Sequence, residues 1–297
     1  MRITFNSQYR DSSAAIDHAA ESLIELQRQV ATGKRVSKGS DDPTAAANAV
    51  NERAQLANVE QYSRAADSAT SRLTVVDSVL SDIVEKLTAA QAATMSARGS
   101  TKTAAQREAV AKALEGIRDD VLDDLNTSFR GAYVFAGAAS TTKPFAEALD
   151  GSIDPYAGSG TEVEADVGSQ EVPIGFDGDA IAQGSDTDHV FTALDDLITA
   201  VRAGDDTGME AGMDALSRAF DRTTTAQSRV GVALQALEGE QSRLQELKLA
   251  ATTRLSKLED ADMAEVIAGM TRADAAYKAA LGAAATAARV SLLDYLG

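Results

Sequence analysis

Residues 59–98 read VEQYSRAADSATSRLTVVDSVLSDIVEKLTAAQAATMSAR, and their apolar and small residues recur in alternating steps of three and four. That spacing places one row of side chains along one side of an α-helix, as in the seam of a coiled coil or helix bundle. It predicts a single helix over about residues 44–98, which would be roughly 80 Å long at 1.5 Å per residue. The seam positions are Tyr62, Ala66, Ala69, Leu73, Val76, Leu80, Ile83, Leu87 and Ala90.

Helix-breaking residues mark both ends of this helix. Asp42 can cap its start, and Pro43 suits the first helical turn, where its missing N–H is not needed. Gly99 interrupts the pattern at the other end. An earlier helical pattern stops at Gly33, so residues 33–43 are predicted to link two helices.

The rest of the chain repeats these signals in reverse order. A second helix after residue 100 is expected to end near Arg130-Gly131. Helical spacing resumes over residues 189–258, and Glu259-Asp-Ala-Asp262 predicts a break before a last helix. The chain can therefore fold back so that its two terminal helices pack together.

The middle of the chain has a different character. Residues 137–188 contain three of the four prolines. Within them, residues 161–167 and 170–176 alternate as two short strands would, on either side of Gly168-Ser169. This pattern predicts a small β hairpin inserted between the helical halves.

We therefore predict a mainly α fold: a long-helix antiparallel bundle or coiled coil with a small β-containing insertion. The predicted divisions are terminal helices at 1–32 and 263–297, a linker at 33–43, a long-helix bundle at 44–136 and 189–258, and an acidic insertion at 137–188.

Composition excludes several classes of partner and site. The net charge is −17, and a polyanion is repelled by nucleic-acid phosphates and by anionic lipid surfaces. The chain has no cysteine, which excludes disulfides, zinc–thiolate sites and cysteine nucleophiles. Its first fifteen residues lack an apolar core, and no stretch is apolar enough to span a bilayer, so we expect neither a cleaved signal peptide nor membrane insertion.

Few residues suggest catalysis or metal binding. His18 and His189 lie far apart, so each is expected to be a solvated surface residue. Four aspartates of the insertion alternate, but without the spacing of a calcium loop, and we interpret them as a solvated acidic loop. They are Asp177, Asp179, Asp186 and Asp188. We expect no enzyme, no cofactor and no metal.

The terminal helices instead favour assembly. Each is separated from the long helices by a breaker and has few large apolar side chains, so each alone would be marginally stable. We expect them to order by packing against copies or partners. The candidate assembly residues are Ile16, Leu23, Leu26, Val30, Val266, Met270, Tyr277, Leu281, Leu292, Leu293, Tyr295 and Leu296.

Several motifs are those of a known family. The segment Met1-Arg-Ile-Thr4, the run Gln29-Val-Ala-Thr-Gly-Lys-Arg-Val36 and Ser40-Asp-Asp-Pro43 together resemble the N-terminal signature of flagellin-like proteins. Gly131-Ala-Tyr-Val-Phe-Ala-Gly137 with Lys143-Pro-Phe145, and the ending Ser291-Leu-Leu-Asp-Tyr-Leu296, are more similar to the hook–filament junction branch of that family. So is Val190-Phe191 with Leu194 and Leu197, ahead of Gly204-Asp205.

This resemblance implies a structural subunit of the bacterial flagellum. Such subunits are exported unfolded through the flagellar type III apparatus with a dedicated chaperone, without a cleaved signal, and act outside the cell. The resemblance implies a ring of copies between the first hook-associated junction protein and the flagellin filament, with terminal helices that order on assembly.

Three alternatives remain open from the sequence. One is a short filament-forming flagellin, which would share the same helical ends. Another is a hydrolase or metal enzyme carried on the insertion, which would need a pocket with perturbed carboxylates. The last is an extended coiled-coil adhesin, which would be expected to carry a signal peptide.

Overall fold

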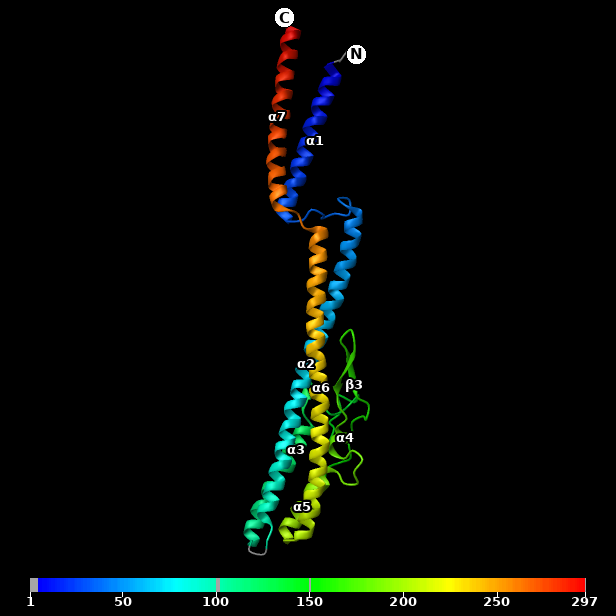
Figure 1. The fold of residues 1–297 in the computed structure, drawn as a ribbon, viewed down its shortest axis with the longest axis vertical. Helices are drawn as coiled ribbons and strands as arrows, with labels where there is room; N and C mark the ends of the chain where they lie inside the picture. The colour runs from blue at the N-terminus through cyan, green and yellow to red at the C-terminus, as the bar shows by residue number, and fades with distance from the viewer. Residues whose placement is uncertain (1–4, 100–101, 150, 297) are drawn as a thin grey trace. The chain divides into compact units, whose positions relative to one another are not determined.

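The computed structural model describes the backbone of residues 5–99, 102–149 and 151–296, and side chains between residues 10 and 286. The chain forms two compact units. One consists of Met1–Asn58 with Leu247–Gly297, and the other of Val59–Glu246. Both boundaries fall inside long helices, α2 (Pro43–Ala97) and α6 (Asp206–Glu259), shown in Figure 1. The boundaries predicted from the sequence lie between helices and stay a prediction.

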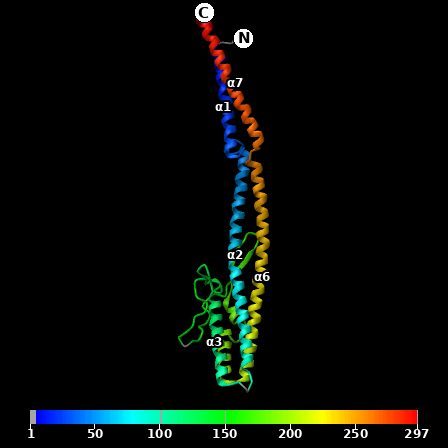
Figure 2. The same ribbon diagram turned by 90° about the vertical axis from the view of Figure 1, so that its left-hand side faces the viewer.

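The larger unit is built on the predicted seam of α2. Every seam position from Ala66 to Ala90 is at most 2% exposed, and Tyr62 is half-buried. Helix α6 runs antiparallel to α2, and Gln241 Nε2 donates to Asp67 Oδ1 across the pair at 2.9 Å (Figures 1 and 2). Helices α3 (Ala104–Leu125) and α5 (Val190–Ala203) pack together and complete the bundle. The mainly α, long-helix fold is confirmed.

Helix α3 ends earlier than the sequence pattern suggested. The chain leaves the helix after Leu125 and forms a two-stranded hairpin, β1 (Ser128–Phe129) and β2 (Ala132–Tyr133). Arg130 and Gly131 both have positive φ, which suits the tight turns that match the twist of paired strands. The expected helix end near Arg130-Gly131 was therefore wrong.

Asn126 gives the physical reason for this early end. Its Nδ2 donates to Phe145 O at 2.9 Å, and Phe145 N donates to its Oδ1 at 3.0 Å. These two bonds tie the end of α3 to a fully buried phenylalanine of the insertion. A contact with a residue this far along the chain is invisible to local helical spacing.

The insertion packs onto the helices of its unit. Strands β3 (Val163–Asp166) and β4 (Glu171–Gly175) pair antiparallel, which confirms the predicted hairpin. A short helix, α4 (Gly178–Ala182), follows. Arg72 of α2 donates to the carbonyl oxygens of Ile174 and Tyr133, and so connects the helix to both hairpins.

The smaller unit contains the two terminal helices. Helix α1 spans Phe5–Thr32 and α7 spans Met263–Leu296, and the two lie side by side (Figures 1 and 2). Within the described part of the chain, no helix is apolar over enough residues to cross a membrane.

Candidate assembly surface

The α1–α7 pair has almost no closed core. Between residues 10 and 32 of α1 no side chain is buried, and the predicted residues Ile16, Leu23, Leu26 and Val30 are all half-buried. Leu26 lies against Gly269 of α7, where an added Cβ would be 3.4 Å from its Cδ2. Two helices alone cover only one side of each other, so the remaining sides stay open to other molecules.

Helix α7 contributes a seam in heptad phase. Val266 and Ala273 are buried, and Met270 and Tyr277 are half-buried. Beyond Tyr277 the seam continues through half-buried Ala280 and Ala284, three and seven residues on.

Leu281 departs from this seam. It follows Tyr277 by four residues, whereas the alternation of fours and threes reaches Ala280, and Leu281 is 43% exposed. It therefore lies beside the seam rather than on it. Its role in assembly stays a prediction, now as an outward-facing side chain.

Exposed apolar side chains concentrate in this unit. Of the ten large apolar side chains that are exposed among the described residues, seven belong to the smaller unit. They are Ile24, Val50, Leu247, Leu249, Met263, Ile267 and Leu281. Single exposed apolar residues are ordinary, but their concentration on the smaller of the two units makes this unit the candidate for association.

The segment between α1 and α2 is ordered by its aspartates. Asp41 Oδ2 accepts hydrogen bonds from Ser37 N at 3.0 Å and Lys38 N at 2.9 Å, and pairs with Arg28 of α1 at 2.9 Å. These backbone donors, aided by the Arg28 guanidinium, lower the pKa of Asp41 to about 2. The carboxylate thus stays charged and holds the turn against α1.

Asp42 performs the predicted capping of α2. Its Oδ1 accepts from Thr44 N at 3.1 Å and from Ala45 N at 3.0 Å, and the helix begins at Pro43. The Ser40-Asp-Asp-Pro43 motif therefore has a physical explanation in which one aspartate fixes the turn and the next starts the helix.

The predicted C-terminal cluster is only partly described. The backbone of α7 is helical through Leu296, but the side chains of Leu292, Leu293, Tyr295 and Leu296 lie outside the described residues. Their contribution to assembly stays a prediction.

His189 was interpreted wrongly from the sequence. It is half-buried rather than solvated, and it caps α5 with Nδ1 accepting from Phe191 N at 3.4 Å. Its ring stacks on Phe191 and meets Phe145 edge-on. Burial lowers its pKa below the ordinary value, and nearby Asp179 partly offsets this effect.

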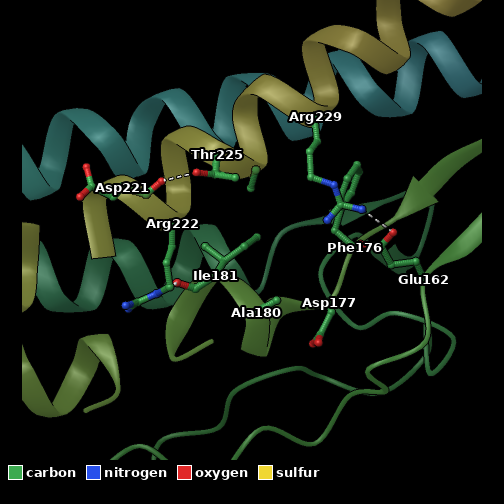
Figure 3. Close-up of a pocket in the computed structure, with 10 residues that line it drawn as sticks. Glu162, Phe176, Asp177, Ala180, Ile181, Asp221, Arg222, Thr225 and Arg229 are labelled. Carbon is green, nitrogen blue, oxygen red and sulfur yellow. Dashed lines mark hydrogen bonds and ion pairs between the residues drawn. The ribbon is translucent and has the colours of Figure 1, made fainter. Parts of the chain in front are cut away.

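A pocket of about 270 Å³ lies in the larger unit between the insertion and α6 (Figure 3). At one side Arg229 pairs with Glu162 at 2.8 Å, and Asp177 caps α4 by accepting from Asp179 N at 3.0 Å. Arg222 pairs with Asp186 and donates to backbone carbonyls of α4. The charged groups named here serve structural contacts, and the pocket gives no support to an enzyme carried on the insertion.

Metal binding finds no support either. Among the described residues, no three His, Asp or Glu side chains lie together as a metal ion would require. Asp186, one of the four alternating aspartates, is engaged by Arg218 as well as Arg222, and Asp188 pairs with Arg218 at 3.8 Å.

The helical regions at both ends of the chain match known protein families. The bacterial flagellin N-terminal helical region matches residues 3–140, and the bacterial flagellin C-terminal helical region matches residues 213–296. The chain belongs to the flagellin family. The match leaves out residues 141–212, which hold most of the insertion together with α5.

Several individual proteins are similar to this chain over most of its length. Flagellar hook-associated protein 3 of Escherichia coli strain K12 is 29% identical over 309 residues, which cover 94% of this chain and 96% of the relative. The solved structure of FlgL from Bacillus cereus has a TM-score of 0.59 at 22% identity and covers 69% of this chain and 99% of its own. The flagellar junction protein FlgL from Legionella pneumophila has a TM-score of 0.59 at 15% identity, covering 72% and 100%.

Proposed function

We propose that this chain is a structural subunit of the bacterial flagellum that forms the junction between hook and filament. Its relative in Escherichia coli, matched along nearly the whole length of both chains, is named flagellar hook-associated protein 3. The fold is also that of the solved flagellar junction protein FlgL from Legionella pneumophila. A structural role fits a molecule whose exposed large apolar side chains lie mostly on the unit that holds the two terminal helices.

The observation that carries this proposal is the open α1–α7 pair. Half-buried seams and exposed residues such as Ile24, at 64%, leave apolar area that two helices cannot cover. Packing against copies of the same chain would bury it, and burial of a large side chain contributes about 1.5–3 kcal/mol. Repeated from copy to copy, such contacts give a closed ring where the rotation between neighbours closes, and an open helical filament where it does not. The proposed junction role requires the closed ring.

The proposal includes partners on both sides of that ring. We expect the first hook-associated junction protein on the hook side and flagellin on the filament side. Export would proceed through the flagellar type III apparatus with a dedicated chaperone, without a cleaved signal, and the protein would act outside the cell. In this role the chain is not an enzyme and needs no cofactor.

A strain that lacks the gene provides the test. We expect electron micrographs to show hooks without filaments and the culture medium to contain unassembled flagellin, both reversed by the intact gene. Normal filaments on the deletion strain would contradict the junction role.

The competing assignment, a short filament-forming flagellin, predicts a different result in vitro. A flagellin polymerises into long filaments when purified protein is mixed with filament fragments, whereas a junction subunit should not. Long filaments made of this chain alone would favour the flagellin assignment.

A further inference from the structure

Glu259, the last residue of α6, lies at the meeting point of three segments of the smaller unit. Its carboxylate pairs with Lys34 Nζ at 2.6 Å and with the guanidinium of Arg53 on α2. Its backbone oxygen accepts from Arg35 N at 2.7 Å and Val36 N at 3.2 Å. One residue thus joins the end of α6 to α2 and to the segment that follows α1.

The pairing extends into the next connection. Ala261 N donates to Gly33 O at 3.0 Å, and Lys34 and Asp260 form an antiparallel bridge. Asp262 then caps α7, with its Oδ1 accepting from Ala264 N at 2.9 Å. The two connections to the terminal helices therefore run as a short ladder beside the Glu259 carboxylate.

The Glu259 side chain is only 3% exposed, whereas both of its basic partners extend to solvent. Among the described residues its Oε1 accepts no hydrogen bond, so this oxygen depends on the charge of Arg53. A buried carboxylate is stable only while it is paired, and removal of its partners leaves an uncompensated buried charge. The stability of the contacts around Glu259 should therefore depend on the balance of charge between this carboxylate and its two basic partners, rather than on any one contact.

We propose that Glu259 is a positioning residue that latches the two connections together, with Lys34 and Arg53 as the charges that keep the latch closed. The closed latch holds the start of α7, the end of α1 and the part of α2 around Arg53 at one point. This positions the open faces of the α1–α7 pair for assembly, and only that last step rests on the proposed function.

Hydrogen exchange of the full-length protein tests the latch through a charge-balance series. Removing both cations in Lys34→Gln/Arg53→Gln strands the carboxylate, and exchange of the Arg35, Val36 and Ala261 amides should accelerate by at least about tenfold. Adding Glu259→Gln to that pair removes the stranded charge and should restore most of the protection. Glu259→Gln alone should have a smaller effect than the double substitution.

Lys278→Gln is the matched control, because Lys278 pairs with exposed Asp274 at 2.7 Å on α7, in the same unit but several turns beyond the start of that helix. It should leave those amides unchanged, and thermal unfolding of the larger unit should be the same in every variant. Additive effects, or a triple variant as labile as the double, would overturn the latch.

Complementation of the deletion strain tests the step to assembly. We expect few filaments with the double variant and substantial recovery with the triple variant. If the double variant exchanges rapidly yet builds normal filaments, the latch does not position the assembly surface. Failure of the intact gene to complement would instead remove the proposed function while leaving the exchange result standing.

Discussion

Single polar residues determine where the helices of this protein begin. Asp42, Thr103, Asp262 and His189 each accept a hydrogen bond from a backbone N–H in the first turn of the helix that follows. Thr103 also forms a reciprocal capping box with Gln106. In a chain with long helices and short connections, these caps determine the points at which the chain can turn.

His189 makes one of these caps sensitive to pH. The folded state lowers its pKa below the ordinary 6.5, so the unfolded chain takes up a proton at a higher pH than the folded chain does. Its stabilising effect is complete above pH of about 6.5 and is lost as pH falls through the lower folded pKa. A protonated ring would lose its acceptor and would place a positive charge at a helix N-terminus.

The larger unit of His189→Asn should therefore lose less stability than wild type between about pH 7 and pH 5, because asparagine caps helices without titrating in this range. Thermal unfolding followed by circular dichroism across this range measures the difference. His18→Asn, an exposed change on α1 in the other unit, is the control and should behave as wild type. Parallel pH profiles for wild type and His189→Asn would show that this cap is not titrating.

The caps made by Asp42 and His189 differ in how far the sequence alone could predict them. The Asp42-Pro43 cap is predictable because both backbone N–H groups that donate to the Asp42 side chain lie within three residues of it. His189 is not, because its burial depends on Phe145, which arrives from a distant part of the insertion. The sequence reasoning also missed the turn that Asp41 fixes. The usable signal was a basic residue near the end of the first helix, Arg28, followed by two acidic residues before the next helix.

At the scale of elements, the seam of α2 was fully predictable from the sequence, but the C-terminal end of α3 was not. An apolar or small residue recurs at every third or fourth position of the seam, so one unexpected residue would not change which face of the helix is predicted to be buried. The β1–β2 hairpin depends on two residues with positive φ and on a long-range hydrogen bond from Asn126 to Phe145. Neither feature produces a periodic pattern in the sequence. The β3–β4 hairpin was predictable because alternation and a turn signal coincide in one short stretch.

The seam itself gives a direct test. Leu80 is fully buried, so Leu80→Asp should destabilise the larger unit by at least about 3 kcal/mol, because the new carboxylate has no partner there. Val232→Asp, at a position of α6 that is 68% exposed, is the matched control and should change stability by less than about 0.5 kcal/mol. Denaturant unfolding of both variants measures the two values, and a wild-type midpoint for Leu80→Asp would refute the seam.

Two glycines of α6 should respond to the same substitution in opposite directions. A Cβ at Gly212 would lie 2.7 Å from Cδ1 and 3.1 Å from Cβ of buried Leu197 on α5, so Gly212→Ala should cost roughly 1–3 kcal/mol. A Cβ at Gly231 would meet nothing within 4 Å, and Gly231→Ala should stabilise the helix by about 0.5–1 kcal/mol. Unfolding midpoints that move together would mean that α5 and α6 do not approach this closely.

At the scale of the whole molecule, the two units differ in how complete their cores are. The larger unit encloses phenylalanines and leucines from helices and insertion alike, whereas in the smaller unit few apolar side chains are fully covered. The sequence predicted that the terminal helices would be incomplete alone, since each lacks enough large apolar residues. It could not predict the unit boundaries inside α2 and α6, because helical periodicity is the same on both sides of them.

This difference allows folding and assembly to be separated by one truncation. Deletion of residues 292–297 removes Leu292, Leu293, Tyr295 and Leu296, four large apolar side chains near the end of α7. The melting temperature should stay close to that of wild type, because the closed core that determines it lies in the larger unit. Contacts of these side chains with neighbouring copies would each contribute about 1.5–3 kcal/mol and would be lost at every interface of the ring.

Expressed in the deletion strain, the truncated protein should therefore fold, yet leave hooks without filaments, no swimming and flagellin in the medium. Leu149→Ser provides the control, because Leu149 is fully exposed on a loop of the larger unit and should support normal swimming. Secreted amounts of each variant must be compared with wild type, since a truncated protein that never leaves the cell would give the same motility defect. Normal filaments built with secreted truncated protein would mean that these four side chains do not join neighbouring copies, and that the exposed residues of α1 and the first half of α7 must carry the assembly contacts instead.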